Sequence, residues 1–357
     1  MKVPCITMLA TLLLTVPAAA QLQITPPAAT PSAAPEKQKS KPHTITKKKE
    51  AAPAPKPSAS PKPTSSPKPA TVIPAPSTDN SNVDLVFGAY QRGQYKTAFD
   101  LATARAQAGD PKAMTMLGEL YSNAMGMRRD YAKAAEWYKR AADAGDREAM
   151  FALSMLRISG RGGPIDKSEA VRLMASAAKL GEPRAAYNLA LLYLDGQTLP
   201  QDVKRSAELL RQAADAGLPE AQYALATFYK EGTGVPKDQE RSVRLLQAAS
   251  LADNVDAEVE YAIAMFNGTG TPKNQPAAVA LLRKASRQGS AIAQNRLAWV
   301  LINGVGTSVD KVEGFKWHLV AKTAGKGDPE LDKQLSDLPA EDRAKAETAA
   351  KKWLGTK

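Results

Sequence analysis

The amino-acid sequence returns to the same residue types every 36 positions between residues 82 and 326. The unit is clearest at 113–146, where two alanine-rich stretches flank a short glycine loop. A fixed period of this length is the signature of stacked supersecondary units, each of which contacts only its neighbours. We therefore predict an all-α solenoid of about seven helix pairs at 82–326. The shorter polar stretch at 327–357, rich in Ala, Lys, Glu and Asp, is predicted to form capping helices.

Glycine and short polar residues mark the expected helix ends. A closing glycine needs a left-handed backbone conformation, which a Cβ would strain, and Asp253 takes this place once. The closing glycines are Gly109, Gly145, Gly181, Gly217, Gly289 and Gly325. A second series follows each internal loop and is expected to cap the second helix by accepting free backbone N–H groups. This series is Asp130, Asp166, Asp202, Asp238, Asn274 and Asp310.

Large apolar residues at matching positions are predicted to fill the core between helices that approach through alanines. In the first helices the core prediction is Leu117, Leu153, Leu189, Leu225 and Leu297. In the second helices it is Trp137, Leu173, Leu209, Leu245, Leu281 and Trp317. One unit cannot bury this apolar face alone, whereas stacked units can.

The repeat has the pattern A-x-x-x-L-G-x-x-Y, then a loop ending in Asp, then A-x-x-W-Y-x-x-A-A-x-x-G, as in 113–145. The loop G-T-G-V-P-K-D at 232–238 is a second clear copy. This pattern resembles the Sel1-like repeat family, which is related to tetratricopeptide repeats. The resemblance implies a right-handed superhelix. It also implies an adaptor that holds partner proteins in a groove, since exported bacterial members of the family are often linked to envelope regulation. A cysteine-rich variant of the family is described as β-lactamase-like, but its cysteines are lacking here.

Residues 1–20 have the features of a secretory signal peptide. Lys2 precedes an apolar run of about 14 residues, which is short of the roughly 20 needed to span a bilayer, and Ala18–Ala20 suits cleavage before Gln21. We predict a periplasmic or secreted protein of a Gram-negative bacterium, with no transmembrane helix in the mature chain. Retention of the segment as an uncleaved anchor is the alternative.

Residues 21–81 are rich in Pro, Lys, Ala and Ser and have too few large apolar residues for a core. Such a composition predicts a disordered linker. The stretch 21–82 holds nine Lys and three acidic residues, so it carries +6 of the net charge of +12. The basicity therefore belongs to the linker, and no nucleic-acid partner is predicted. A plain tether and a contact with cell-wall polymer are the two hypotheses for it.

The sequence points to no catalytic residue, metal ligand set or cofactor. Cys5 is the only cysteine and lies in the predicted signal, and His43 and His318 are the only histidines. The G-x-G loops each follow a helix, whereas a nucleotide fingerprint follows a strand. The recurring aspartates lie about 10 Å apart, too far to share a proton or an ion. A non-catalytic scaffold is predicted, with a β-lactamase-like or cell-wall-acting hydrolase, and peptidoglycan or polysaccharide binding, as alternatives.

The candidate binding surface is a stripe on the first helices. Positions two, six and nine after the leading alanine share one face, since residues at i, i+4 and i+7 do so. This stripe varies between units, and Tyr and Trp are favoured at binding hot spots. The candidate residues for binding a partner protein or peptide are Phe151, Tyr187, Tyr223 and Trp299. The alternative is that the stripe is core between helix layers, especially for its aliphatic members Met155, Ile158, Leu191, Leu194, Ile263 and Ile302.

Overall fold

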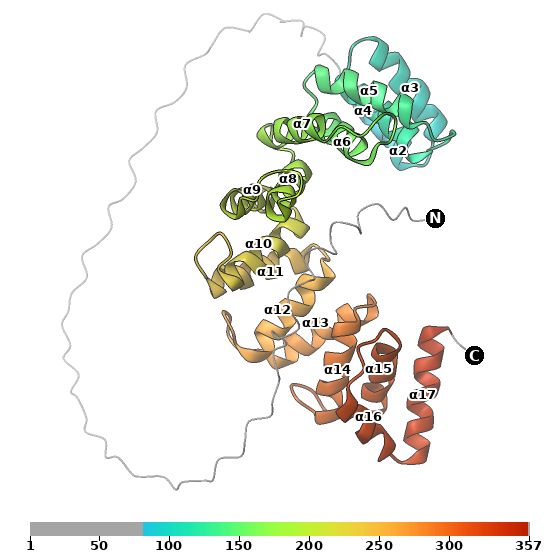
Figure 1. Ribbon diagram of the computed structural model, residues 1–357. Helices are drawn as coiled ribbons and strands as arrows, with labels where there is room; N and C mark the ends of the chain where they lie inside the picture. Colours follow the sequence, from blue (N-terminus) through green and yellow to red (C-terminus); the bar gives the residue numbers. More distant parts are fainter. Residues whose placement is uncertain (1–80, 356–357) are drawn as a thin grey trace, which may run out of the picture. The chain divides into compact units, whose positions relative to one another are not determined.

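A computed structural model describes residues 81–355, and within that range the chain forms sixteen α-helices and no strand (Figure 1). The all-α solenoid prediction is confirmed for these residues. The predicted signal peptide at 1–20, all but the last residue of the predicted linker at 21–81, Cys5 and His43 lie outside the described part of the chain.

The helices follow one another in pairs along the chain (Figure 1). A shorter opening pair is formed by α2 (Ser81–Gln91) and α3 (Tyr95–Gln107). The first helices of the next six pairs are α4 (Pro111–Asn123), α6 (Arg147–Ser159), α8 (Pro183–Asp195), α10 (Pro219–Glu231), α12 (Val255–Asn267) and α14 (Ala291–Asn303). Their second helices are α5 (Tyr131–Asp143), α7 (Lys167–Lys179), α9 (Val203–Asp215), α11 (Gln239–Leu251), α13 (Gln275–Arg287) and α15 (Lys311–Thr323). The chain then forms α16 (Pro329–Ser336) and α17 (Ala340–Leu354).

The second helices begin at the predicted caps. In α9, for example, Asp202 Oδ1 accepts the backbone N–H of Arg205 at 2.9 Å, and the other five predicted caps accept in the same way. Each cap satisfies a donor that a helix leaves free at its N-terminus. The first helices end in a left-handed residue, which is glycine in five units and Ala124 in the first.

In five of the six internal loops one glycine is required by a close approach as well as by its backbone angle, and Thr198 takes its place in the loop between α8 and α9. Gly234 has φ +66°, and a Cβ added there would lie 2.5 Å from the carbonyl oxygen of Val203 at the start of α9. Real Cβ atoms do not approach an oxygen so closely, so the loop rests on the second helix of the preceding unit only because it carries no side chain there. The loops therefore join neighbouring units.

Contacts between helices run from neighbour to neighbour. The two helices of a unit pack together, and the second helix packs on the first helix of the next unit. The alanines predicted to allow this approach are completely buried in most units, including Ala149, Ala185, Ala177 and Ala213. Each unit is thus stabilised by the units beside it, as expected of a solenoid.

The predicted core of the second helices is correct in part. Leu173, Leu209 and Trp317 are buried, but Trp137, Leu245 and Leu281 are only half-buried. The next residue along the helix is buried in all six units. That deeper row is Tyr138, Met174, Leu210, Leu246, Leu282 and His318. A helix with a wide apolar face offers two adjacent rows, and the sequence pattern alone selected the one nearer its edge.

His318 is the exception in the deep row, because it is a polar residue with no exposed surface. Its Nε2 lies 2.9 Å from Asp332 Oδ1, and Lys322 Nζ lies 2.7 Å from the same oxygen. Asp332 belongs to α16, so the pair links the last repeat helix, α15, to the segment that follows the array. His318, the one histidine within residues 81–355, is thereby a packed residue with one polar partner.

The Lys322 ammonium and the His318 ring hold the pKa of Asp332 below its ordinary value of about 3.9. The carboxylate therefore stabilises the link from α15 to α16 above the unfolded pKa, and this contribution is lost as the pH falls through the lowered folded value. We expect a carboxyl-carbon NMR titration of Asp332 with a midpoint below 3.9, accompanied by shifts of α16 amides that are absent in Asp332→Asn. A midpoint at or above the ordinary value would show that the carboxylate is not held by these cations.

Candidate protein-interaction surface

Three of the four candidate aromatics occupy the same position in three consecutive units. Phe151, Tyr187 and Tyr223 are the fifth residues of α6, α8 and α10, and each is half-buried against the core. Trp299 is also half-buried but is the ninth residue of α14, one helical turn further along and two units away. The structure therefore forms one aromatic row of three residues and leaves Trp299 apart from it.

The other members of the predicted stripe divide between surface and core. Leu191, Phe266 and Ile302 are buried, so they belong to the core. The remaining members are half-buried: Met155, Ile158, Leu194, Thr227, Lys230 and Ile263. Most half-buried members of the stripe therefore lie on α6, α8 and α10, beside the aromatic row. On α12 and α14 more of the equivalent positions are buried in the core.

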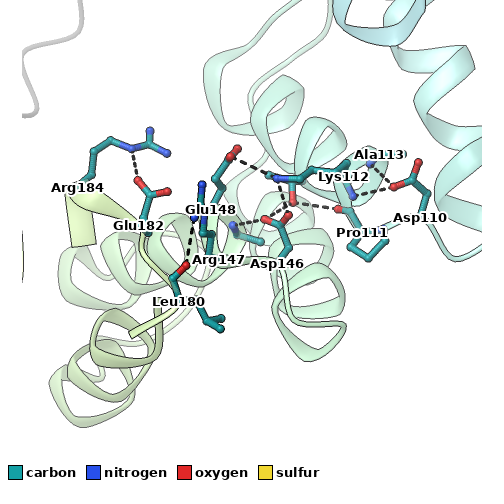
Figure 2. Close-up of polar contacts among 12 residues, drawn as sticks. Asp110, Pro111, Lys112, Ala113, Asp146, Arg147, Glu148, Leu180, Glu182 and Arg184 are labelled. Carbon is teal, nitrogen blue, oxygen red and sulfur yellow. Dashed lines mark hydrogen bonds and ion pairs between the residues drawn. The ribbon is translucent and has the colours of Figure 1, made fainter. Parts of the chain in front are cut away.

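Polar contacts join α4 to α6 and lie at the start of α8 (Figure 2). Lys112 of α4 pairs with Asp146 at 3.1 Å and with Glu148 of α6 at 3.3 Å. The guanidinium of Arg184 on α8 pairs with Glu182 at 2.7 Å and lies 5.1 Å from the ring centroid of Phe151 on α6. Further along, Lys230 of α10 pairs with Glu260 of α12 at 2.9 Å. These contacts join α4 to α6, α6 to α8 and α10 to α12, and one of them involves Phe151 of the row directly.

The two tyrosines of the row lie in acidic surroundings. Burial raises the pKa of Tyr187 and of Tyr223, and nearby carboxylates raise both further because they disfavour a phenolate. The tyrosine hydroxyls therefore remain protonated and can donate hydrogen bonds at physiological pH. The carboxylates concerned are Glu220 beside Tyr187, and Glu260, Asp256 and Glu231 beside Tyr223.

A cavity of about 190 Å³ opens at the first unit, between α2, α3, α4 and α6. Val86, Phe87 and Met116 supply apolar walls, and Glu119 and Glu148 supply carboxylates. Burial raises the pKa of Glu119, whose carboxylate makes no ion pair or side-chain hydrogen bond with any residue in 81–355. Arg105 and Lys112 also line the cavity, so it combines apolar groups with charges of both signs.

Neither a metal site nor a membrane span is found among the described residues. Residues 81–355 contain no group of three or more His, Cys, Asp or Glu side chains arranged to hold a metal ion. None of the helices between Ser81 and Leu354 has both the length and the apolar character needed to cross a bilayer.

The sequence model of the Sel1 repeat matches six consecutive units that together cover more than half of the chain: 111–146, 147–182, 183–218, 219–254, 255–290 and 291–326. The chain belongs to the Sel1 repeat family. The resemblance seen in the sequence is therefore confirmed, and the boundaries of the matched units agree with the 36-residue period. Sel1 repeats form a protein-interaction scaffold, so the fold is that of a binding protein.

Solved Sel1 structures have the same fold. A Sel1 repeat protein from Oxalobacter formigenes is 26% identical with a TM-score of 0.61, and the match covers 68% of this chain and 99% of that one. The protective antigen c5321 of uropathogenic Escherichia coli, described as displaying an SLR fold, is 22% identical with a TM-score of 0.52, over 77% of this chain and 68% of that one. No curated protein matches the chain.

Sequence reasoning found the aromatic row but missed the carboxylates around it. Their signal was present at the second residue of each first helix, which alternates in charge through Lys112, Glu148, Arg184 and Glu220 before ending at Asp256. The residue at this position varies between units, as do the residues of the aromatic stripe, whereas the repeat framework stays the same.

Proposed function

We propose that this Sel1 repeat protein is a non-catalytic adaptor that binds an extended segment of a partner protein along α6, α8 and α10. The observation that carries the proposal is the row of Phe151, Tyr187 and Tyr223, which are half-buried at one position of three successive units. Aromatic residues in this state combine a large apolar surface with little conformational entropy to lose, which favours them as anchors.

The repeat spacing predicts the spacing of the partner's anchors. Neighbouring packed helices lie on the order of 10 Å apart, and a chain in the polyproline II conformation advances about 3.1 Å per residue with three residues per turn. A partner segment that crosses the row in this conformation would therefore present apolar side chains at every third residue. The carboxylates Glu220, Glu231 and Asp256 favour Lys or Arg between these anchors, whereas Glu260 is already paired with Lys230.

The proposed setting is the bacterial cell envelope, where the protein would have a regulatory role. Support comes from the sequence, in which 1–20 resembles a cleavable signal, 21–81 a linker, 82–326 the array and 327–357 a cap. We expect the protein in the periplasmic fraction with an N-terminus at Gln21. An N-terminus at Met1 in membrane pellets would contradict cleavage.

The binding proposal is tested by crosslinking in cells. A photo-reactive amino acid at Asn188, half-buried beside Tyr187 on α8, should capture one partner segment, identified by mass spectrometry. A synthetic peptide of that segment should then bind the purified protein. We expect the triple alanine variant of Phe151, Tyr187 and Tyr223 to weaken binding at least a hundredfold, since hot-spot residues contribute about 2 kcal/mol or more each.

The matched control replaces exposed second-helix residues, Lys204 and Glu208, by alanine and should leave affinity unchanged. Circular dichroism must show full helicity in every variant. Equal binding by the triple variant, or loss of helicity on substituting the row, would favour the alternative that these aromatics serve only as core.

A further inference from the structure

A second cavity, of about 190 Å³, lies at the other end of the array, where α13, α14, α15 and α17 meet. It is distinct from the aromatic row in both position and chemistry. Its lining consists of Arg283, Arg287, Leu297, Glu313, Lys316, Trp317 and Trp353. Two tryptophans and three cations thus surround a single carboxylate.

The tryptophans form the apolar wall of this cavity. The rings of Trp317 and Trp353 meet edge to face with centroids 4.9 Å apart, and Trp353 is 43% exposed. The Lys316 ammonium lies 4.2 Å from the Trp317 centroid and 5.3 Å from that of Trp353. Lys316 is therefore held in place by aromatic faces, where a cation is attracted by the ring quadrupole.

The carboxylate of the cavity is already engaged. Glu313 Oε1 accepts the indole N–H of Trp317 at 2.7 Å and lies 3.1 Å from the ammonium of Lys316. Its negative charge is thus shared with Lys316 and is not directed at the two arginines. Within residues 81–355, neither Arg283 nor Arg287 makes a hydrogen bond or an ion pair.

In two other second helices the same two positions hold one cation and one acid. Arg283 and Arg287 are the ninth and thirteenth residues of α13 and share a face at i, i+4. In α5 these positions hold Lys139 and Asp143, which pair at 2.7 Å, and in α9 they hold Arg211 and Asp215. Of the six second helices from α5 to α15, only α13 has cations at both positions, although like charges at this spacing destabilise a helix.

We propose that this corner, defined by Arg283, Arg287, Lys316 and Trp353, binds an acidic segment of a partner protein. One carboxylate of that segment pairs with the two guanidiniums, and an apolar neighbour packs on Trp353. The cavity is smaller than the roughly 300–1,000 Å³ of small-molecule sites, so it suits one side chain that projects from a larger partner. Arginine forks match a carboxylate in geometry as well as in charge.

The test uses the full chain and the peptide acetyl-Gly-Leu-Glu-Glu-Leu-Gly-amide, with the Gln-Gln version as the uncharged match. We expect the acidic peptide to shift the indole N–H signals of Trp317 and Trp353 in NMR spectra, while the signals of Trp137 and Trp299 stay in place. The Gln-Gln peptide is expected to bind at least about tenfold more weakly, because it cannot form charge-assisted hydrogen bonds.

The decisive variant is Arg287→Asp, which recreates the opposite-charge arrangement of α9 and should therefore not reduce the melting temperature. It is expected to weaken binding of the acidic peptide at least about tenfold. Arg296→Gln, which alters a cation on α14 outside the cavity lining, is the control and should leave affinity unchanged. Equal affinity for the two peptides, equal binding by Arg287→Asp, or shifts confined to Trp137 and Trp299 would each overturn the proposal.

Because the aromatic row lies on α6, α8 and α10 and this corner is formed by α13, α14, α15 and α17, we expect the two sites to bind independently. Arg287→Asp should leave binding at the row intact. The triple alanine variant of the row should equally leave the acidic peptide bound at the corner.

Discussion

Replacing Lys284 by methionine is expected to destabilise α12 and α13 by about 3 kcal/mol. Glu258 is completely buried, and the ammonium of Lys284, 2.6 Å from its Oε1, is its ionic partner among the described residues. Removing one partner of such a pair leaves an uncompensated charge in the core, which costs about 3–5 kcal/mol. We take the lower end because the Lys284 side chain is 45% exposed and water can partly replace it.

The chain itself supplies the control for this prediction. Gln222 and Gln294 occupy the position of Glu258 in neighbouring units, and each donates its amide to a backbone carbonyl eight residues earlier, at 3.3 and 3.1 Å. In a Glu258→Gln background the buried charge is absent, so Lys284→Met should then cost less than about 1 kcal/mol. Hydrogen exchange of α12 and α13 amides measures both values. A similar loss with and without Glu258 would show that the ion pair does not stabilise these helices.

Gly234→Ala is expected to destabilise the fourth repeat by about 3 kcal/mol. Two effects add at this residue. Its φ of +66° is unfavourable for alanine, and the new methyl group would lie 2.5 Å from the Val203 carbonyl oxygen. Relief of that contact requires the loop to leave the start of α9, which separates two units. Thermal unfolding and hydrogen exchange across α9–α11 check the value.

Gly217→Ala is the matched control, because Gly217 has a φ of +86° but no atom within 4 Å of the added Cβ. Only the backbone penalty of about 1 kcal/mol remains there. Ala124, which adopts φ 57° in the first full unit, illustrates that alanine can occupy this conformation. If the two variants were equally destabilised, the close approach of Gly234 to Val203 would make no contribution to the loss of stability.

The periodic features of the fold were predictable because each depends on a local rule. The caps at Asp202 and its equivalents, and the left-handed glycines, follow from what a helix end requires of one residue. The aromatic row at Phe151, Tyr187 and Tyr223 followed from helical periodicity, but its role in binding stays a prediction.

What the sequence did not reveal depends on contacts between units. Lys284 contacts Asp253, 31 positions away, and Glu258 because successive units stack. No pattern in the sequence predicts that these residues pair. In this cluster Asp253, which takes the place of a closing glycine, adopts φ 60° and pairs with Lys284 at 2.6 Å. The arginine pair at Arg283 and Arg287 is likewise informative only when the cavity shared with Trp353 is known.

Five of the six internal loops rest on the preceding unit through a glycine, and each repeat unit packs mainly on the units beside it, so the repeat units share one kind of backbone interface. Duplication of one 36-residue module in the gene would create no type of junction that the chain does not already contain. Evolution can therefore change the length of the recognition surface by whole repeat units. The site at Arg283, Arg287, Lys316 and Trp353 would remain unchanged at the C-terminal end of the array.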